Sequence, residues 1–530
     1  MVFLLSFFQL SLVVGQQSVD IEWNKTLGGS LEEQATSIWQ TLDGGYIVSG
    51  DTHSDNGDIS DGNNGSADYW IVKLDNLGNK EWDKTFGGSR EERAQSIQQT
   101  SDGGYIVVGF TGSKDGDISD GNYASLGSHD YWIIKLDGSG NKVWDKTYGG
   151  SSSDSPCSFQ QTSDGGYIVA GSTSSNNGDV SDGNNGKEDY WIIKLDGSGN
   201  KVWDKTLGGS DSDMARSIQQ TSDDGYIIAG FTRSKDGDIS DGNYASLGSY
   251  DYWIVKLDES GNKVWDKIYG GSWLDIANSI QETSGGGYIV SGHTWSNDGD
   301  ISDGRFEGDE NLNAWDGYEL WILKLDSIGN KLWDKTLGGS SGDDAYSIIQ
   351  TSDGGYIVAG YSRSNDGDIS DGNNGSEDYW IVKLDATGNK VWDKTLGGAS
   401  EDYASSIVQT SNGGYIVAGT TFSNNGDVND ENNGNSDIWI VKLSEENTQS
   451  LNSTEQLHNF SISPNPTTSQ IVIGTDLIQT MEEVLITDMT GKIVKQFEIQ
   501  NTITKIDVSN LQNGIYMVKS GNFTQKLIKK

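Results

Sequence analysis

Pairs of aspartates recur seven times along this 530-residue chain, each within the pattern Gly-Asp-[Ile/Val]-[Ser/Asn]-Asp. An asparagine follows six of the pairs, and another acid stands four residues after each of seven Gly-Gly steps. Calcium binds about six to eight carboxylate, amide and carbonyl oxygens and accepts irregular loops. The pattern therefore predicts calcium ligands at Asp58, Asp61, Asp117, Asp120, Asp179, Asp182, Asp238, Asp241, Asp300, Asp303, Asp368, Asp371, Asp427 and Asp430.

A second interpretation of these loops needs no metal. Their spacing departs from that of an EF-hand, because the glycine of Asp-Gly-Asp-Ile-Ser-Asp-Gly stands one position late. Asp and Asn side chains also cap turns through nearby backbone N–H groups and keep a surface solvated. Both interpretations stay open at the level of the sequence.

Tryptophans supply a second set of candidate contacts. Fourteen of the 18 tryptophans belong to two repeated signatures, and we expect these to pack between neighbouring units. Trp39 and three tryptophans of the fifth repeat break that pattern. We expect ligand contacts from the three in the fifth repeat, Trp273, Trp295 and Trp315.

No catalytic residue is predicted. The four histidines, His53, His129, His293 and His458, accompany no Ser or Cys nucleophile motif, and the single Cys157 excludes a disulfide framework. Glycoside hydrolysis needs two carboxylates in differently tuned environments, so a repeated pair indicates architecture. One irregular acidic cluster stands beside Trp315 in the fifth repeat and comprises Asp309, Glu310, Asp316 and Glu319.

Three signatures, each present seven times, define the elements that must position these residues. They are Trp-[Asp/Asn]-Lys-[Thr/Ile], Gly-Tyr-Ile-[Val/Ile] and Trp-Ile-[Val/Ile/Leu]-Lys-Leu. Each unit contains four runs rich in β-branched and aromatic residues, separated by Gly, Asn and Asp, which predicts four antiparallel strands, a to d. Such a unit is typical of a propeller blade.

The phase of the repeats at the two ends predicts a closed ring. The first repeat segment, residues 21–29, is a strand d, and the last, residues 436–443, is a strand c. Joining them completes one sheet from both ends and removes an exposed edge. We therefore predict an all-β fold, a seven-bladed β-propeller over residues 21–443. The Gly-Gly-Tyr and Trp signature resembles that of kelch and galactose-oxidase propellers, although the histidine ligands and Cys-linked tyrosine of a copper-radical oxidase are not visible here.

The parity of the strands assigns the loops to two faces. The d-a and b-c loops share one face, and the a-b and c-d turns share the other. The turns are short and nearly identical, whereas the b-c loops vary in length, with insertions in repeats 2, 4 and 5. Binding usually resides in variable loops on a rigid scaffold, so we expect it on the b-c face.

Charge and the N-terminal sequence restrict the partners. The formal net charge is −42 and the pI about 4.2, so nucleic acids and anionic lipids are repelled. Cations and neutral polymers such as glycans remain open. Residues 1–15 form an apolar run without acids, which predicts a signal peptide rather than a membrane span.

The composition changes after residue 443. Residues 444–457 form a polar linker, and a new strand pattern occupies residues 458–530. This last segment resembles the C-terminal sorting domain of type IX secretion cargo from Bacteroidetes. The resemblance implies a small β-sandwich, recognised by the outer-membrane secretion machinery of a Gram-negative bacterium and then cleaved or anchored at the cell surface. The match is carried by Pro464, Asn465, Pro466, Asp488, Gly491, Lys492, Asn513, Gly514, Ile515, Tyr516 and Lys519.

Two functions follow as hypotheses. The first is a monomeric binding or structural module at the cell surface or in the extracellular space, stabilised by calcium and recognising a glycan or another surface polymer. The second is a secreted polysaccharide hydrolase of endoglucanase type that uses acids on the b-c face.

Overall fold

The computed structural model describes residues 17–119, 128–240, 249–304, 317–429, 432–448, 461–463, 466–474, 482–488, 492–499, 503–520 and 523–530. Within these ranges every regular element is a strand, as the all-β prediction requires. The chain divides into two compact units, Met1–Thr448 and Gln449–Lys530. The predicted signal peptide and residues 449–457 of the predicted linker lie outside the described residues.

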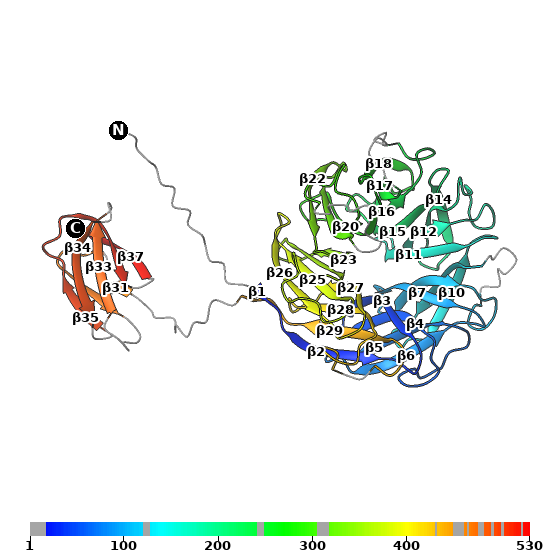
Figure 1. The fold of residues 1–530 in the computed structure, drawn as a ribbon, viewed down its shortest axis with the longest axis horizontal. Helices are drawn as coiled ribbons and strands as arrows, with labels where there is room; N and C mark the ends of the chain where they lie inside the picture. The colour runs from blue at the N-terminus through cyan, green and yellow to red at the C-terminus, as the bar shows by residue number, and fades with distance from the viewer. Residues whose placement is uncertain are drawn as a thin grey trace. The chain divides into compact units, whose positions relative to one another are not determined.

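The described part of the first unit contains seven four-stranded sheets, or blades, in which sequence neighbours pair (Figure 1). Blades 1 to 3 comprise β3 (Glu33–Gln40), β4 (Tyr46–Thr52), β5 (Asp68–Leu74) and β6 (Lys80–Phe86); β7 (Glu92–Gln99), β8 (Tyr105–Thr111), β9 (Asp130–Leu136) and β10 (Lys142–Tyr148); and β11 (Asp154–Gln161), β12 (Tyr167–Thr173), β13 (Asp189–Leu195) and β14 (Lys201–Leu207). Blades 4 to 6 comprise β15 (Asp213–Gln220), β16 (Tyr226–Thr232), β17 (Asp251–Leu257) and β18 (Lys263–Tyr269); β19 (Asp275–Glu282), β20 (Tyr288–Thr294), β21 (Glu319–Leu325) and β22 (Lys331–Leu337); and β23 (Asp343–Gln350), β24 (Tyr356–Ser362), β25 (Asp378–Leu384) and β26 (Lys390–Leu396). Blade 7 comprises β27 (Asp402–Gln409), β28 (Tyr415–Thr421), β29 (Asp437–Leu443) and β2 (Ile21–Leu27).

Blade 7 is built from both ends of the repeat region, as the sequence predicts. Strand β2 pairs antiparallel with β29, and Thr26 lies opposite Trp439. In Figure 1 the blue β2 runs beside β29. A second short pairing, β1 (Gln17–Ser18) with β30 (Asn447–Thr448), lies beside this junction. An N-terminal strand thus covers the edge that β29 would otherwise expose.

Hydrogen bonds connect each blade to the next around the whole ring. A backbone N–H in each a-b turn donates to a side-chain oxygen at the end of strand a in the following blade, over 2.7–3.0 Å. The seventh of these bonds runs from Ser411 of blade 7 to Gln40 of blade 1. The ring of sheets is therefore continuous.

The repeated tryptophans occupy the interfaces between blades, which confirms their predicted packing role. The strand-d tryptophans lie against the Gly-Tyr tyrosines of the next blade, with ring centroids 5.8–6.2 Å apart. The strand-c tryptophans are completely buried, and in blades 1 to 6 each indole N–H donates to the strand-d aspartate of its own blade over 3.1–3.2 Å. Strands b and c are buried along almost their full length, which explains their apolar sequences.

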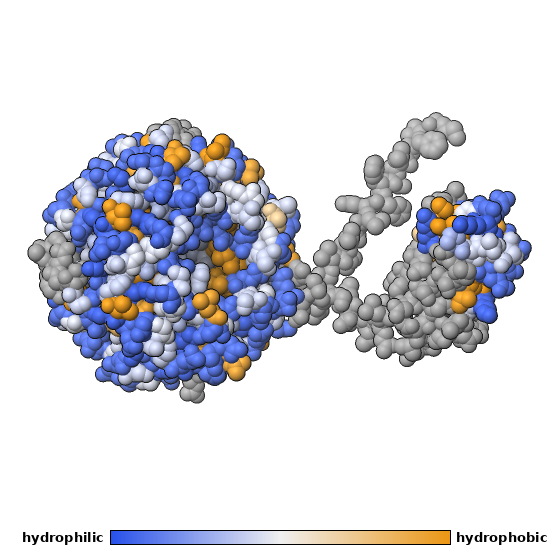
Figure 2. All heavy atoms as spheres, turned by 180° about the vertical axis from the view of Figure 1, so that it is seen from behind, coloured by the Kyte–Doolittle hydropathy of each residue, from blue (hydrophilic) through white to orange (hydrophobic). Residues whose placement is uncertain are grey.

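The face in Figure 2 is predominantly hydrophilic, and its hydrophobic residues lie in small separate groups. Single exposed apolar residues are normal on soluble proteins. On that face, therefore, no extended apolar area suggests a docking surface.

The second unit contains two sheets. One orders β31, β32 and β35, and the other orders β34, β33, β36 and β37. Their inward residues form one apolar core that includes Ile471, Val484 and Tyr516. The strands are β31 (Ser461–Ser463), β32 (Gln470–Gly474), β33 (Glu482–Asp488), β34 (Ile493–Ile499), β35 (Ile503–Asp507), β36 (Gly514–Ser520) and β37 (Phe523–Lys529).

Candidate functional site

The first aspartate of each predicted calcium pair joins the b-c loop to the preceding d-a loop. In blade 1, Asp58 N–H donates to Gly28 O at 2.9 Å, and Gly28 N–H donates to Asp58 Oδ2 at 3.2 Å. The same two bonds recur in every blade, at Asp117, Asp179, Asp238, Asp300, Asp368 and Asp427. The two loops therefore share one face, as predicted, and these carboxylates act as loop clamps.

The second aspartates lie further out. Asp61 pairs with Lys84 at 2.9 Å, Asp182 with Lys205 at 3.4 Å and Asp303 with Lys335 at 3.5 Å. Asp371 is exposed. The other three, Asp120, Asp241 and Asp430, lie outside the described residues.

A deeper pair of carboxylates lies beneath each clamp. In blade 3, Asp189 at the start of strand c faces Asp213 at the start of the next strand a, and both are completely buried. Asp189 Oδ2 accepts a bond from Asn185 N, whereas Oδ1 has no hydrogen-bond partner among the described residues. Burial, together with a smaller effect of the neighbouring carboxylates, raises the pKa of Asp189 to about 7. The same arrangement, with an unpartnered Oδ1 and a raised pKa, recurs at Asp68, Asp378 and Asp437.

Differences between the seven repeats mark a separate region on the b-c face. The fifth residue of every strand b is Gly, but the sixth varies, as does the second residue of strand a opposite it. A position that maintains the blade should be the same in each copy, so these positions are free to serve another purpose. The strand-b residues are Asp51, Phe110, Ser172, Phe231, His293, Tyr361 and Thr420, and the strand-a residues are Gln34, Arg93, Ser155, Met214, Ile276, Asp344 and Tyr403.

In blades 5 to 7, Tyr361 and Tyr403 at these positions join Trp295, Tyr318 and Tyr346 in a continuous aromatic cluster. Trp295 stacks on Tyr318 with an interplanar angle of 9°, and the Tyr318 and Tyr361 hydroxyl oxygens lie 2.5 Å apart. Tyr361 in turn contacts Tyr346 and Tyr403, with ring centroids 5.8 and 5.1 Å away. Tyr346 is 38% exposed, so the cluster reaches the surface.

Polar groups border this aromatic cluster. His293 Nδ1 lies 2.9 Å from Asp344 Oδ1, and Asn278 Nδ2 donates to the same oxygen over 3.2 Å. Burial raises the pKa of Tyr361 well above its usual value, so its hydroxyl stays protonated at neutral pH and both donates and accepts hydrogen bonds. Arg363 donates to Glu377 over 2.6 Å.

In blades 1 and 2 the corresponding region contains the charged residues Asp51 and Arg93. Arg93 Nε donates to Glu91 over 2.6 Å, and His129 Nε2 lies 3.9 Å from the same carboxylate. Burial raises the pKa of Asp51 to about 7 despite the opposing effect of Arg93. The b-c face is therefore chemically asymmetric around the ring.

The three predicted tryptophan contacts have different outcomes. Trp295 belongs to the aromatic cluster, and Trp273 is 59% exposed in the d-a loop before β19. Trp315 lies outside the described residues, as do three of the four acids predicted beside it. The fourth, Glu319, is buried at the start of β21. The tyrosines and His293 were missed as site residues, although a comparison of the repeats position by position would have found them.

The described sorting residues lie mainly at two places in the second unit, at Asp488 and Lys492 and at the start of β36. Lys492 N–H donates to Asp488 Oδ1, and Tyr516 Oη donates to Gln512 O. The side chains of Lys492 and Lys519 are exposed. So are Pro466, Asn513, Gly514 and Ile515, whereas Pro464, Asn465 and Gly491 lie outside the described residues.

Residues 461–530 match the family described as the secretion system C-terminal sorting domain. This segment is a type IX secretion sorting domain. The sorting domain indicates export to the cell surface or the extracellular space and implies an interaction with the type IX machinery. Among the described residues, no helix is long and apolar enough to cross a membrane.

Other comparisons concern mainly the propeller. The regulatory protein FlaEY of Caulobacter vibrioides is 24% identical over 349 residues, which cover 61% of this chain and 34% of that protein. The chain thus spans about a third of that relative. A fungal AA5-family alcohol oxidase in complex with copper is 13% identical, with a TM-score of 0.41 and coverage of 97% and 99%. PorZ, a surface component of the type IX secretion system of Porphyromonas gingivalis, is 11% identical, with a TM-score of 0.23 and coverage of 98% and 86%.

Proposed function

We propose that this exported propeller is a monomeric binding module whose ligand contacts lie on the b-c face, over the aromatic cluster of blades 5 to 7. The observation that carries the proposal is the variation between repeats. The tryptophans of strands c and d and the Gly-Tyr tyrosines, which pack between blades, are the same in all seven copies, whereas the residues at the b-c ends of strands a and b differ. Binding residues on a repeated scaffold are expected to vary in this way.

The chemistry of the cluster favours a neutral glycan. Aromatic rings stack on the apolar faces of sugars, and protonated tyrosine hydroxyls exchange hydrogen bonds with sugar hydroxyls. Tyr346, Tyr361 and Trp295 provide these groups together. A net charge of −42 disfavours a polyanionic ligand.

A glycan array on the full chain, combined with a reducing-sugar assay, tests this proposal. We expect binding without the release of reducing ends. Tyr346→Ala should weaken binding at least about tenfold, which corresponds to the loss of roughly 1.4 kcal/mol. Gln95→Ala, at the same register in blade 2, is the matched control and should leave binding unchanged. Release of reducing ends would instead favour the hydrolase hypothesis.

Calcium stabilisation stays a prediction. In support of it, buried carboxylate oxygens such as Asp189 Oδ1 lie beside a second carboxylate and have no partner among the described residues, and a cation would satisfy both. No group of three His, Cys, Asp or Glu side chains in the described ranges could hold a metal, so backbone carbonyls and water would have to supply the remaining ligands. Thermal melts with calcium and with excess chelator decide the matter, because a ligand of the native state must raise the melting temperature.

Export through the sorting domain is tested by deletion. Removal of residues 458–530 should leave the propeller in the periplasm, because the secretion machinery would no longer recognise it. Cell fractionation and surface labelling measure the outcome. Surface delivery at the level of the full chain would refute the role proposed for this segment.

A further inference from the structure

Strand a of each of the seven blades lines the central channel of the ring, and an open cavity of about 260 Å³ lies at the end of this channel near the a-b turns. Among the described residues, no charged side chain lines the cavity, although the chain as a whole carries a net charge of −42. The residue before the last of each strand a contributes to the lining. In order of blades these residues are Trp39, Gln98, Gln160, Gln219, Gln281, Ile349 and Val408.

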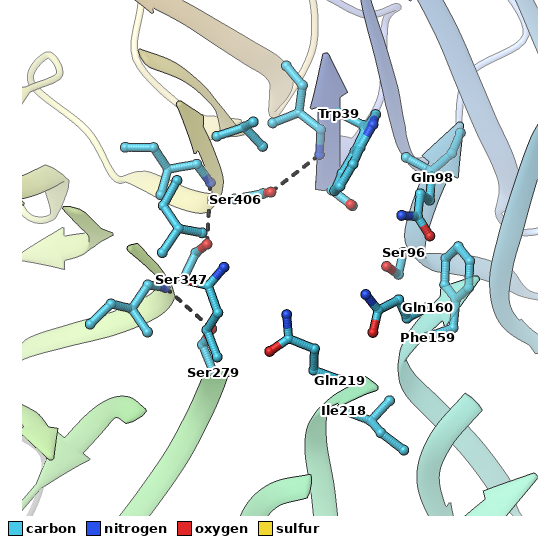
Figure 3. A pocket seen from close by; sticks show the side chains of 18 of the residues that line it. Trp39, Ser96, Gln98, Phe159, Gln160, Ile218, Gln219, Ser279, Ser347 and Ser406 are labelled. Carbon is cyan, nitrogen blue, oxygen red and sulfur yellow. Dashed lines mark hydrogen bonds between the residues drawn. The ribbon is translucent and has the colours of Figure 1, made fainter. Parts of the chain in front are cut away.

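The four glutamines present their amide nitrogens to the cavity. Each Oε1 accepts a backbone N–H from strand a of the following blade, over 2.5–3.0 Å. Because the oxygen is fixed in this way, Nε2 must point elsewhere, and no acceptor for it occurs in the described part of the chain. In Figure 3 the nitrogens of Gln98, Gln160 and Gln219 point toward the middle of the cavity.

Serines deeper in the channel resemble the glutamines, because their oxygens accept backbone N–H groups and their own donors remain available. Five serine Oγ atoms accept a backbone N–H from the isoleucine of a neighbouring blade, for example Ile38 N–H to Ser406 at 3.4 Å and Ile348 N–H to Ser279 at 3.3 Å (Figure 3). Each hydroxyl keeps its own O–H to donate. Each of these side-chain oxygens thus already accepts a bond from a neighbouring strand, and the O–H and N–H donors remain for a ligand.

The other arc of the lining is apolar. Ile349, Val408 and Trp39 replace glutamine in blades 6, 7 and 1, which are consecutive around the ring. Trp39 is 39% exposed at the cavity. The cavity therefore has a donor side of four blades and an apolar side of three.

We propose that this end of the channel binds the carboxylate of a small amphipathic acid, with the apolar body of the acid against Trp39, Ile349 and Val408. A carboxylate only accepts hydrogen bonds, and its two oxygens match the amides of adjacent glutamines. A sugar hydroxyl would also need acceptors directed into the cavity, whereas the glutamine oxygens are directed toward the neighbouring strand. The volume is below the roughly 300–1,000 Å³ of drug-sized pockets, so the ligand is a small molecule or one end of a longer one.

Isothermal titration of the full chain tests this site with four probes: phenylacetate, acetate, phenylacetamide and methyl β-glucopyranoside. Phenylacetate should bind one-to-one, and the isosteric amide should bind at least about tenfold more weakly, because charge-assisted hydrogen bonds are the stronger kind. The double substitution Gln160→Val and Gln219→Val should weaken phenylacetate binding by at least about tenfold. Valine already stands at this register in blade 7, so the fold accepts it.

Two further variants separate the site from general damage to the fold. Gln161→Val removes a comparable bond, from Ser101 N–H, but its side chain does not line the cavity, so binding should be unchanged. Trp39→Gln should weaken phenylacetate but not acetate. The proposal is overturned if phenylacetate shows no binding in the millimolar range, if the amide or the glucoside binds as well, or if the double variant binds normally. None of these results depends on the b-c face, so the two proposals fail separately.

Discussion

Replacement of the buried Asp189 by asparagine should stabilise the propeller at alkaline pH. The carboxyl is completely buried beside Asp213, and its Oδ1 has no hydrogen-bond partner among the described residues. Asparagine keeps an oxygen for the Asn185 N–H bond and places an N–H where Oδ1 lies, directed toward a carboxylate. The substitution thus replaces an uncompensated buried negative charge by a neutral group that donates a hydrogen bond.

The magnitude follows from the pKa. Burial raises the pKa of Asp189 from 3.8 to about 7, so between about pH 4 and pH 7 the folded chain holds a proton that the unfolded chain has released. This proton contributes to the free energy of unfolding, and the contribution is fully present below about pH 4 and is lost as the pH rises to about 7. A shift of about three units corresponds to about 4 kcal/mol. Asp189→Asn should recover a free energy of this order at pH 8 and progressively less toward pH 4.

Urea denaturation with excess chelator measures the effect. All 18 tryptophans lie between residues 23 and 439, so their fluorescence reports on the propeller alone. The control is Asp196→Asn. Asp196 lies in an exposed turn, where hydrogen bonds from Asn200 lower its pKa, so no gain at pH 8 is expected. A variant that is less stable than wild type at pH 8, or a difference that does not change with pH, would refute the reasoning.

Three further predictions follow from the repeats. Gly285→Asp should raise the free energy of unfolding by about 1 kcal/mol. In other blades an aspartate at this turn position pairs with the lysine equivalent to Lys324, and a Cβ at Gly285 would meet open space. Burial lowers the pKa of Lys324 to about 8, and an NMR titration should show a higher pKa in that variant. Gly208→Ala should lower the free energy of unfolding, measured by urea denaturation, by about 1–3 kcal/mol, because its Cβ would lie 2.7 Å from both Asp189 Cγ and Asp213 Oδ2. Its control is Gly285→Ala, which should change the free energy of unfolding little because its Cβ would meet open space. Deletion of residues 17–29 should expose the edge of β29 and cause self-association in size-exclusion chromatography, and a deletion mutant that stays monomeric and fully folded would contradict the closure argument.

The sequence by itself determined the blades and their closure. The alternation of apolar residues and the Gly-rich turns are local signals within each repeat. These signals recur with a period of about 60 residues, so each copy supports the interpretation of the others. The offset between a first strand d and a last strand c left only one way to complete the seventh sheet. The sorting domain was equally visible, since its turn motifs lie close together in the sequence.

Only the tertiary structure decided what the polar residues do. Asp58 looks like a cation ligand in the sequence, but its carboxylate accepts a bond from Gly28, which is 30 residues away in the chain. The contact between His293 and Asp344 and the arc of glutamine nitrogens likewise join different blades. Hydrogen-bond partners depend on distances of a few tenths of an ångström between segments far apart in the chain, and no local pattern encodes those distances.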